Sequence, residues 1–551
     1  MQNAISPQAV PRVTIVMIMR ERHLMTEAAL ESIKHNTGLP YRLIYGDTRI
    51  PSWLREILLR RADEWRLEIA EFEDAPWPNQ IRKRIAPTID TPYVVFLDND
   101  VSVAPGWLES MIACADETGA GIVCPVYLIG EPGTAKRIHM AGGRLTAIKD
   151  AAGTLMREES LLKDQDLTLV ASTLRRQKCD FAEYHCVLMR TEVAKLPGLF
   201  DERIVCVHEH IDTALTARGA GYAVYFEPRA QVTYVAHALR LSDLPLFRAR
   251  WDPAAVDSSL KAFSAKWGVI DDWRSFGAIR LSMDAHRAQL DPLRPSAAAS
   301  PVADRPMLPH DLRQTLSGLF ELAQSRGFNQ EEWGMLEMAH RLAMMLMNGA
   351  YRPCGRPFIN HLVGTASVLV HYGFRARVVG AGLLHSAYTH SARGSADGQA
   401  DIARIHQLLG GRESRLEASA YAYALRAQRW QRLRTSRSWQ LELSVEDAEI
   451  LAIASANEVD MHLSGEYRFS GRRDMETRNV ADLIAHVCSV LGVPGLAETL
   501  RIESERLLQV PSKTDSRNPA AFRIIGDQLV PAINTAAISA LQRDARETPA
   551  S

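Results

Sequence analysis

No C-x-x-C pair occurs among the seven cysteines of this 551-residue sequence, so the usual motifs of a zinc ribbon and of a redox-active pair are absent. No stretch approaches the roughly 20 apolar residues of a membrane-spanning helix, and the apolar run near the N-terminus is too short for a secretion signal. Neither sign of charge is in excess, with 64 Lys and Arg against 65 Asp and Glu. A chain without a basic field does not attract nucleic acid as a whole. We therefore expect a cytoplasmic protein with reduced cysteines and no nucleic-acid partner.

The composition is that of an ordinary globular protein, with 46% hydrophobic and 23% charged residues. At roughly 150 residues per domain, the length predicts about two to four domains. One segment rich in Pro, Ala and Ser lacks hydrophobic periodicity, which indicates a linker between strand-rich and helix-rich text. The predicted parts are a first domain at 1–284, the linker at 285–309, a helical domain at 310–511, and a helical extension and tail at 512–551.

Short apolar runs alternate with helical patterns across the first domain. Strands and helices that alternate at this spacing favour an α/β fold built on a parallel sheet. The helical domain has helical spacing with few strand signals, which favours an all-α fold. The predicted strands of the first domain are 13–19, 41–46, 67–72, 93–97 and 121–129.

Two aspartates follow the fourth predicted strand, in the sequence YVVFLDNDV. Ligands of open α/β sheets gather at the carboxyl ends of strands. Asp98 and Asp100, one residue apart on a turn, can bind a hard divalent cation through oxygen and leave positions open for a ligand. The alternative is a turn in which Asp98, Asn99 or Asp100 only caps the helix that begins after it.

The motifs around this turn resemble those of a family-2 glycosyltransferase with the GT-A fold, a Rossmann-like nucleotide-diphospho-sugar transferase. The resemblance covers about 12–270 and rests on VTIVMIMRER, IYGDT, IRKRIAPTIDTPYVVFLDNDV and, further along, L-P-G-L-F-D-E and G-Y-x-V-x-x-x-P. It implies an inverting transfer of a hexosyl group from a nucleotide-sugar donor to an acceptor that the sequence does not identify.

The same resemblance implies roles for individual residues. Mn²⁺ or Mg²⁺ is expected on Asp98 and Asp100, with Asp98 also close to the donor. Asp47 stands where such enzymes have an acid that contacts the base or ribose, and Arg82 stands at the family's usual Arg. Lys83 replaces the Asn that often follows, so one nucleotide contact differs.

The acceptor half of the resemblance contains the candidate base. Family members usually have E-D-x-D where this chain has Glu209, His210, Ile211 and Asp212. An inverting transfer needs a base near the acceptor hydroxyl, and either carboxylate or the imidazole, which titrates near neutral pH, can serve. Alternatively, Glu209 and Asp212 only favour the N-terminal end of a helix. His237 stands where some relatives place a His that joins the metal.

The helical domain resembles the HD-domain superfamily, especially the hydrolase domain of bifunctional ppGpp synthetase/hydrolase enzymes. The resemblance covers about 312–500 and rests on A-H-x-x-x, G-R-P-F-I-N-H and A-G-L-L-H. Active members bind a divalent ion with a His, a His-Asp pair and a distant Asp. The expected pocket residues of this chain are His340, His361, His385 and Asn457.

Two carboxylates of that metal site are missing, because Ser386 replaces the Asp of the pair and Asn457 replaces the distant Asp. A neutral site binds Mg²⁺ or Mn²⁺ poorly, although Glu458 or Asp460 offers a further ligand for zinc. We therefore expect a degenerate HD-like fold that is retained for binding or assembly.

These patterns predict a metal-dependent inverting glycosyltransferase with an accessory HD-like domain. Homodimerisation is one of the roles that the second domain could have. Two alternatives remain. One is an HD-type phosphohydrolase whose first domain senses a nucleotide, and the other is a non-catalytic scaffold that binds a nucleotide-sugar.

Overall fold

The structure is a computed structural model with two compact units, Met1–Gln289 and Leu290–Ser551. The first unit is described from residue 10. The predicted linker 285–309 spans the division between the units, and its residues 291–303 lie outside the described residues. None of the described helices is long and apolar enough to cross a membrane. The structure describes residues 10–290, 304–391, 400, 402–404, 407, 443–469, 478–508, 521–525, 528–533 and 535–539. Within these ranges, residues 49, 73, 75, 76, 152 and 238 are not described.

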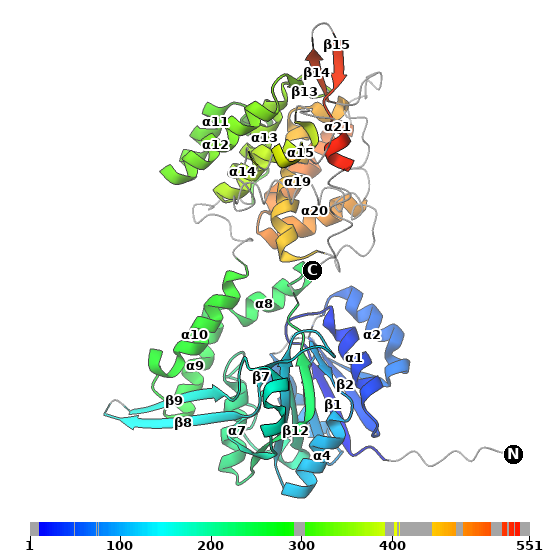
Figure 1. The fold of residues 1–551 in the computed structure, drawn as a ribbon, viewed down its shortest axis with the longest axis vertical. Coiled ribbons are helices and arrows are strands. Elements are labelled where there is room, and N and C mark those ends of the chain that lie inside the picture. The colour runs from blue at the N-terminus through cyan, green and yellow to red at the C-terminus, as the bar shows by residue number, and fades with distance from the viewer. Residues whose placement is uncertain are drawn as a thin grey trace, which may run out of the picture. The chain divides into compact units, whose positions relative to one another are not determined.

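A ten-stranded sheet forms the centre of the first unit (Figure 1). Its main order is β10-β12-β6-β11-β4-β1-β2-β3, while β5 pairs with β12 and β7 pairs with β6. The strands are β1 (Val13–Ile18), β2 (Tyr41–Asp47), β3 (Leu67–Glu71), β4 (Tyr93–Asp98), β5 (Val101–Val103), β6 (Ile122–Ile129), β7 (Arg137–Met140), β10 (Gln177–Cys179), β11 (Cys186–Arg190) and β12 (Val224–Tyr234).

The sheet is mixed, which corrects the expectation of a parallel sheet. Strands β1 to β4 pair in parallel, but β11 runs antiparallel to both β4 and β6. A parallel neighbour needs a crossover connection, usually a helix. Between β6 and β11 the described chain forms further strands and two short helical turns, α5 (Leu167–Val170) and η2 (Ala171–Thr173), but no helix long enough for such a crossover.

Helices cover the sheet because its central strands are apolar on both faces. All six residues of β1 and of β4 are buried, which is the pattern of strands with helices on either side. The remaining helices of this unit are α1 (Met25–Asn36), α2 (Ser52–Trp65), α3 (Pro78–Ile85), η1 (Ala86–Thr88), α4 (Trp107–Thr118), α6 (Thr191–Ala194), α7 (Glu209–Gly219), η3 (Leu241–Asp243), α8 (Leu244–Arg250), α9 (Pro253–Trp267) and α10 (Trp273–Ala288).

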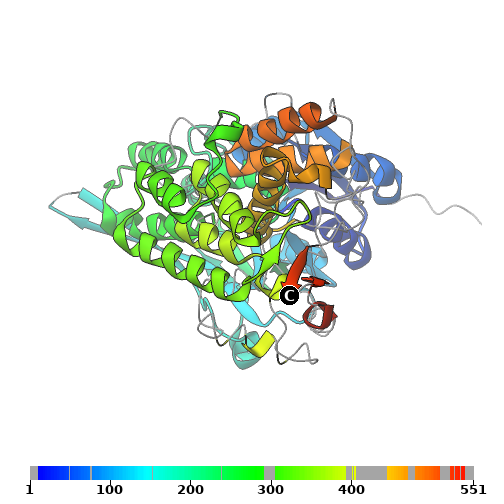
Figure 2. The same cartoon turned by 90° about the horizontal axis from the view of Figure 1, so that it is seen from above.

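A two-stranded hairpin, β8 (Gly143–Asp150) and β9 (Gly153–Ser160), extends from the first unit in both views (Figures 1 and 2). Its outer end lies against the segment before α10, where Ile270 N donates to Thr154 O at 2.9 Å. The hairpin is thereby joined to the segment that leads into α10.

The second unit is mainly helical, as the sequence predicts. Side chains cap the starts of some of its helices, for example α19 (Val445–Leu463), where Ser444 Oγ accepts from Asp447 N. The described helices are η5 (Pro309–Asp311), α11 (Leu316–Ser325), α12 (Gln330–Leu346), α13 (Phe358–His371), α14 (Ala376–Leu384), α15 (Ala387–His390), α19 (Val445–Leu463), η6 (Glu466–Phe469), α20 (Arg478–Leu491) and α21 (Pro494–Leu508).

Three short strands correct the all-α expectation for this unit, and two of them lie within 512–551, where residues 535–539 are helical. They are β13 (Ala350–Tyr351), β14 (Phe522–Ile525) and β15 (Gln528–Pro531), joined as an antiparallel sheet. The sequence FRIIGDQLVP explains the difference, since branched residues flank the turn-favouring pair Gly-Asp.

Candidate active site

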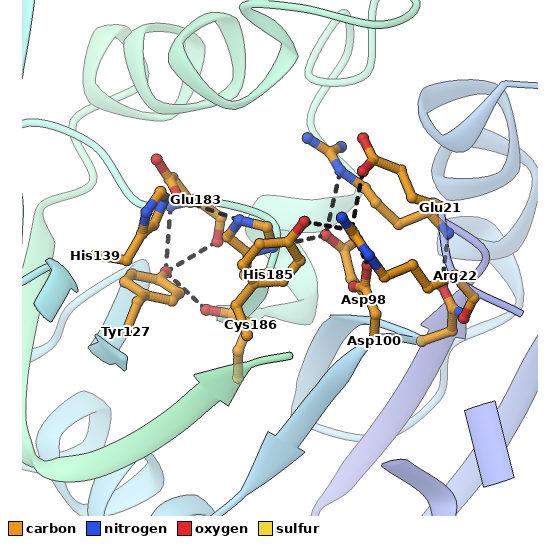
Figure 3. A network of polar contacts seen from close by, with 12 residues as sticks. Glu21, Arg22, Asp98, Asp100, Tyr127, His139, Glu183, His185 and Cys186 are labelled. Carbon is orange, nitrogen blue, oxygen red and sulfur yellow. Dashed lines mark hydrogen bonds and ion pairs between the residues drawn. The ribbon is translucent and has the colours of Figure 1, made fainter. Parts of the chain in front are cut away.

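The carboxyl ends of β1 and β4 and the start of β11 meet at one edge of the first unit's sheet. The register pairs Ile18 with Asp98 and Leu97 with Cys186, so His185 lies directly beside Asp98. Backbone contact fixes this arrangement, because Asp98 N donates to His185 O at 3.2 Å. Asp98, Asp100 and His185 each place one potential metal-ligand atom within 4.8 Å of the others (Figure 3).

The carboxylate of Asp100 has the environment of an incomplete cation site. It is fully buried, and neither of its oxygens has a hydrogen-bond partner among the residues that the structure describes. The nearest cation is Arg22 Nη1 at 3.7 Å. Burial, followed by the charge of Asp98, raises the pKa of Asp100 to about 8. A divalent cation fits this group because it would complete the coordination of Asp100 and offset the two adjacent charges.

Asn99, between the two aspartates, ties their turn to the loop that follows β1. Its Oδ1 accepts from Arg20 N at 2.7 Å, and its Nδ2 donates to Arg22 O at 2.7 Å and to Thr26 Oγ1 at 3.0 Å. These bonds use three of the amide's hydrogen-bonding positions. The central residue of D-N-D thus fixes the backbone that carries Arg20 and Arg22 to the aspartates.

The loop after β1 (residues 19–24) also contacts α8 and the residue that follows it, through Glu21. The carboxylate of Glu21 lies 3.0 Å from Arg250 Nε and 3.1 Å from Arg22 Nη1, and it accepts from Trp251 Nε1 at 3.1 Å. Burial alone raises the pKa of Glu21, but the two guanidinium groups outweigh it and lower the pKa to about 2. The ring of Trp251 stacks on His286 of α10 at 3.9 Å.

A cavity of about 270 Å³ opens beside this loop, and it is lined by two of the three candidate bases, Glu209 and His210. Glu209 Oε1 lies 3.1 Å from Arg20 Nη1. Burial raises the pKa of Glu209, but Arg20 and Arg250 outweigh it and lower the pKa to about 2. His210 Nε2 lies 3.8 Å from Glu158 Oε2, which belongs to the hairpin strand β9.

Asp212, the third candidate base, is engaged elsewhere and does not line that cavity. Its carboxylate lies 2.7 Å from Lys266 Nζ and accepts from Trp267 Nε1 at 2.8 Å, at the end of α9. Burial raises the pKa of Asp212 against the opposing effect of Lys266. Its contacts therefore join α7 to α9.

The remaining residues expected around the donor are dispersed. Asp47, at the end of β2, pairs with Arg55 at 2.5 Å and accepts from Ile50 N at 3.2 Å. The guanidinium of Arg82 is buried on the ring of Tyr184, with 3.3 Å between Cζ and the ring centroid, and none of its nitrogens has a hydrogen-bond partner. Burial lowers the pKa of Arg82 and leaves these hydrogen-bond donors unsatisfied among the described residues.

Lys83 forms a surface ion pair with Glu202. His237 is half-exposed, and its Nδ1 lies 3.5 Å from Glu131 Oε1. The group formed by Asp98 and Asp100 therefore includes His185 in the place for which the sequence suggests His237.

His185 is the residue that the sequence analysis missed. It lies 87 positions from Asp98, in the phrase EYHCVLM, and only the antiparallel placement of β11 brings the two together. His185 Nδ1 lies 3.1 Å from Asp98 Oδ2. On its other side Glu183 pairs with His139 at 3.0 Å, and this pairing, which outweighs burial, lowers the pKa of Glu183. One sequence signal could have indicated His185. It is a polar residue directly before β11, and β11 pairs with β4, the strand that ends at Asp98.

A second polar group lies inside the helical unit, where His361, Asp460 and Glu466 place potential ligand atoms within 4.8 Å of one another. His361 Nδ1 is 2.6 Å from Asp460 Oδ2. Arg356 Nη2 donates to the same oxygen at 2.5 Å, and Arg352 pairs with Glu466. Two guanidinium groups therefore already neutralise the two carboxylates.

The other residues expected in this pocket lie around His361 to different degrees. The rings of His361 and His385 are 5.3 Å apart between centroids, and a hydrogen bond links His385 to Asn457. Burial lowers the pKa of His385 to about 4. Ser386 is buried at the start of α15. His340 lies half-buried on α12, and it is not among the residues that these contacts join.

Comparisons with known proteins concern the first unit. Residues 14–182 match the family model described as Glycosyl transferase family 2. Among solved structures, one of GalNAc-T7 with UDP, GalNAc and Mn²⁺ is similar at 15% identity and a TM-score of 0.33. That alignment covers 41% of this chain and 43% of the other, so the chain spans less than half of that protein's length. No curated protein matches the chain. The family match supports a glycosyltransferase with the GT-A fold.

Proposed function

We propose that the first unit is a metal-dependent inverting glycosyltransferase that takes a hexosyl group from a nucleotide-sugar. The observation that carries the proposal is the carboxylate of Asp100, which is buried beside Asp98 and His185 and accepts no hydrogen bond from the described residues. A buried carboxylate without hydrogen bonds is costly unless a ligand supplies the missing contacts, and Arg22 Nη1 at 3.7 Å is too far away to donate one. Asp98, Asp100 and His185 would hold Mn²⁺ or Mg²⁺, which acts as a Lewis acid toward the departing diphosphate.

The chain's own residues supply the remaining charge around the donor. The guanidinium of Arg82 has three unpartnered nitrogens, and Arg20 faces the same edge of the sheet with its Nε 3.4 Å from Asp98. Guanidinium groups bind phosphate oxygens through charge-assisted hydrogen bonds. Arg82 and Arg20 are therefore suited to orient a diphosphate next to the two aspartates, with Asp47 closer to the nucleoside.

We assign acceptance of the acceptor's proton to His210. A general base works best when it titrates near the working pH, and Glu209, whose pKa is lowered to about 2, is a weak proton acceptor. The imidazole of His210 lines the same cavity and faces Glu158, which can stabilise the protonated ring. A single displacement by the deprotonated hydroxyl inverts the anomeric centre.

The proposal is tested by incubating the full chain with UDP-, GDP- and dTDP-sugars and Mn²⁺ while nucleotide release is measured. Asp100→Asn keeps the size of the side chain and removes a charged ligand. We expect it to lower turnover by about 100-fold, equivalent to about 2.7 kcal/mol of transition-state stabilisation. Full turnover in this variant would contradict the assignment.

For the helical unit we propose an accessory HD-like role in ligand binding or dimerisation. Because Arg352 and Arg356 pair with Glu466 and Asp460, a cation would have to displace both guanidinium groups. The competing phosphohydrolase function predicts release of phosphate without sugar transfer. That activity would be lost in His385→Ala and retained in Asp100→Asn.

A further inference from the structure

The two nitrogens of the His185 ring face two different carboxylates (Figure 3). Nδ1 lies 3.1 Å from Asp98 Oδ2, and Nε2 lies 3.6 Å from Glu183 Oε2. Glu183 is held in turn by His139, whose Nε2 is 3.0 Å from the same oxygen. The result is a chain of contacts that runs from His139 through Glu183 and His185 to the aspartate edge of the sheet.

We propose that Glu183 and His139 are positioning residues, which fix His185 as a nitrogen ligand of the cation at Asp98 and Asp100. This inference rests on the proposed function, since it requires that cation. A neutral imidazole carries one ring proton, and the group that accepts it decides which nitrogen keeps a lone pair. Without a cation, Nδ1 donates to Asp98, because a carboxylate can only accept. A cation at Asp98 and Asp100 would take the place of that proton, and the ring proton would then lie on Nε2, which faces Glu183, as in the carboxylate–histidine–metal arrangements of other metal sites.

The surroundings of the ring leave it little freedom to turn. Tyr234 stacks on His185 with the centroids 4.6 Å apart, and its hydroxyl is held by Arg22 Nη1 at 2.6 Å. The backbone on either side of the ring is fixed by Tyr127, whose Oη lies 2.9 Å from Glu183 O and 2.8 Å from Cys186 O. Both the ligand and its acceptor are therefore positioned before any cation binds.

A competing reading is a second cation held by His139, Glu183 and His185, whose ligand atoms also lie within 4.8 Å of one another. The single ring of His185 serves both groups, and its shorter contact is to Asp98. His139 and Glu183 already satisfy each other at hydrogen-bond distance. The geometry therefore favours one cation with an oriented ligand, and the number of bound ions separates the two readings.

The experiment is a titration of the full chain with Mn²⁺ alone, in which electron paramagnetic resonance detects free and bound ion. Spin-echo spectra of the bound ion report whether a nitrogen is coordinated. We expect one Mn²⁺ per chain and a nitrogen signal that His185→Gln abolishes. Glu183→Gln should weaken Mn²⁺ binding by about tenfold and reduce that signal.

Glu158→Gln is the matched control, because it removes the same charge from the same cavity without contact to His185. It should change Mn²⁺ affinity by no more than about twofold. His139→Gln is a second variant that should also weaken binding, in case Glu183→Gln does not fold.

The outcomes separate this inference from the function on which it rests. If the wild type binds one Mn²⁺ but Glu183→Gln and His139→Gln behave like Glu158→Gln, the positioning role is wrong and the proposed function stands. Two Mn²⁺ per chain would replace the positioning role with a second metal site. Absence of Mn²⁺ binding, or binding that Asp100→Asn leaves intact, would overturn the metal-dependent function itself.

Discussion

Arg20 Nη1 lies 3.1 Å from Glu209 Oε1, while Nε of the same guanidinium lies 3.4 Å from Asp98 Oδ2. One cation therefore connects the edge of the sheet that carries the candidate metal ligands with the start of α7. Despite its burial, Glu209 stays ionised because of Arg20 and Arg250, with a pKa of about 2. Glu209 therefore offsets the positive charges of Arg20 and Arg250, and His210 is the better proton acceptor of the two residues.

The two residues are distinguished by their effect on the pH dependence of turnover. His210→Gln should lower turnover by about 100-fold and remove the acid limb of the pH profile that protonation of the base produces. Glu209→Gln should lower turnover but keep that limb. Loss of the limb in Glu209→Gln together with its retention in His210→Gln would reverse the assignment.

The contacts of Glu21 predict a loss of stability in acid. Its folded-state pKa of about 2 is below the ordinary value of 4.5, so the stabilisation is present above pH 4.5 and is lost as the pH falls toward 2. Glu21→Gln should lower the free energy of unfolding by roughly 3 kcal/mol at pH 7, because it leaves Arg250 and Arg22 without their buried partner.

Chemical denaturation of wild type and Glu21→Gln at several pH values checks this prediction. The difference between the two proteins should shrink steadily below pH 4.5. A difference that stays constant down to pH 2.5 would show that Glu21 is not the titrating group.

Asp212 offers a test of a residue that the sequence suggests for catalysis and the structure places in packing. Asp212→Asn keeps the shape but loses the charge that faces Lys266 and Trp267. We expect the free energy of unfolding to fall by about 2 kcal/mol. Glu159→Gln, an exposed carboxylate on β9, is the control and should stay within about 0.5 kcal/mol of the wild type. A stable Asp212→Asn that has lost turnover would restore the catalytic role.

Gly364 on α13 tests the polar group of the helical unit. A Cβ at this position would lie 1.8 Å from Asp460 Oδ1, so the carboxylate would have to leave Arg356 and His361. Gly364→Ala should destabilise the unit by roughly 3 kcal/mol, as expected when a buried ion pair is broken. Gly334→Ala on α12 meets nothing within 4 Å and should stabilise by about 0.5 kcal/mol or more. Equal thermal shifts in the two variants would contradict the tight packing of Asp460.

The sequence predicts those parts of the molecule that local patterns determine. Strands β1 and β4 are recognisable as continuous apolar runs because both of their faces are buried, and the aspartates that follow β4 come out at its carboxyl end. The antiparallel course of β11 is not predictable in this way, since it depends on which distant strands pair. His185 was missed for that reason, because its contact with Asp98 exists only through that pairing.

The catalytic base cannot be chosen from the sequence, because the choice depends on ion pairs between elements that are far apart in the chain. The letters of Glu209, His210 and Asp212 do not reveal that Arg20 approaches the first or that Lys266 approaches the third. In the helical unit, the HD-like motifs indicate His361 and His385, but the partner of His361 is Asp460. Arg352 and Arg356, which pair with Glu466 and Asp460, come from the loop between β13 and α13.

The central claim is that a cation on Asp98 and Asp100 enables a nucleotide-sugar to transfer its sugar. The most direct measurement is nucleotide release from the UDP-, GDP- and dTDP-sugar series as a function of Mn²⁺ concentration, for the wild type and for Asp100→Asn. The account predicts that release in the wild type saturates with Mn²⁺, disappears with a chelator and falls by about 100-fold in the variant. Release that is independent of Mn²⁺, or equal in the two proteins, would contradict it.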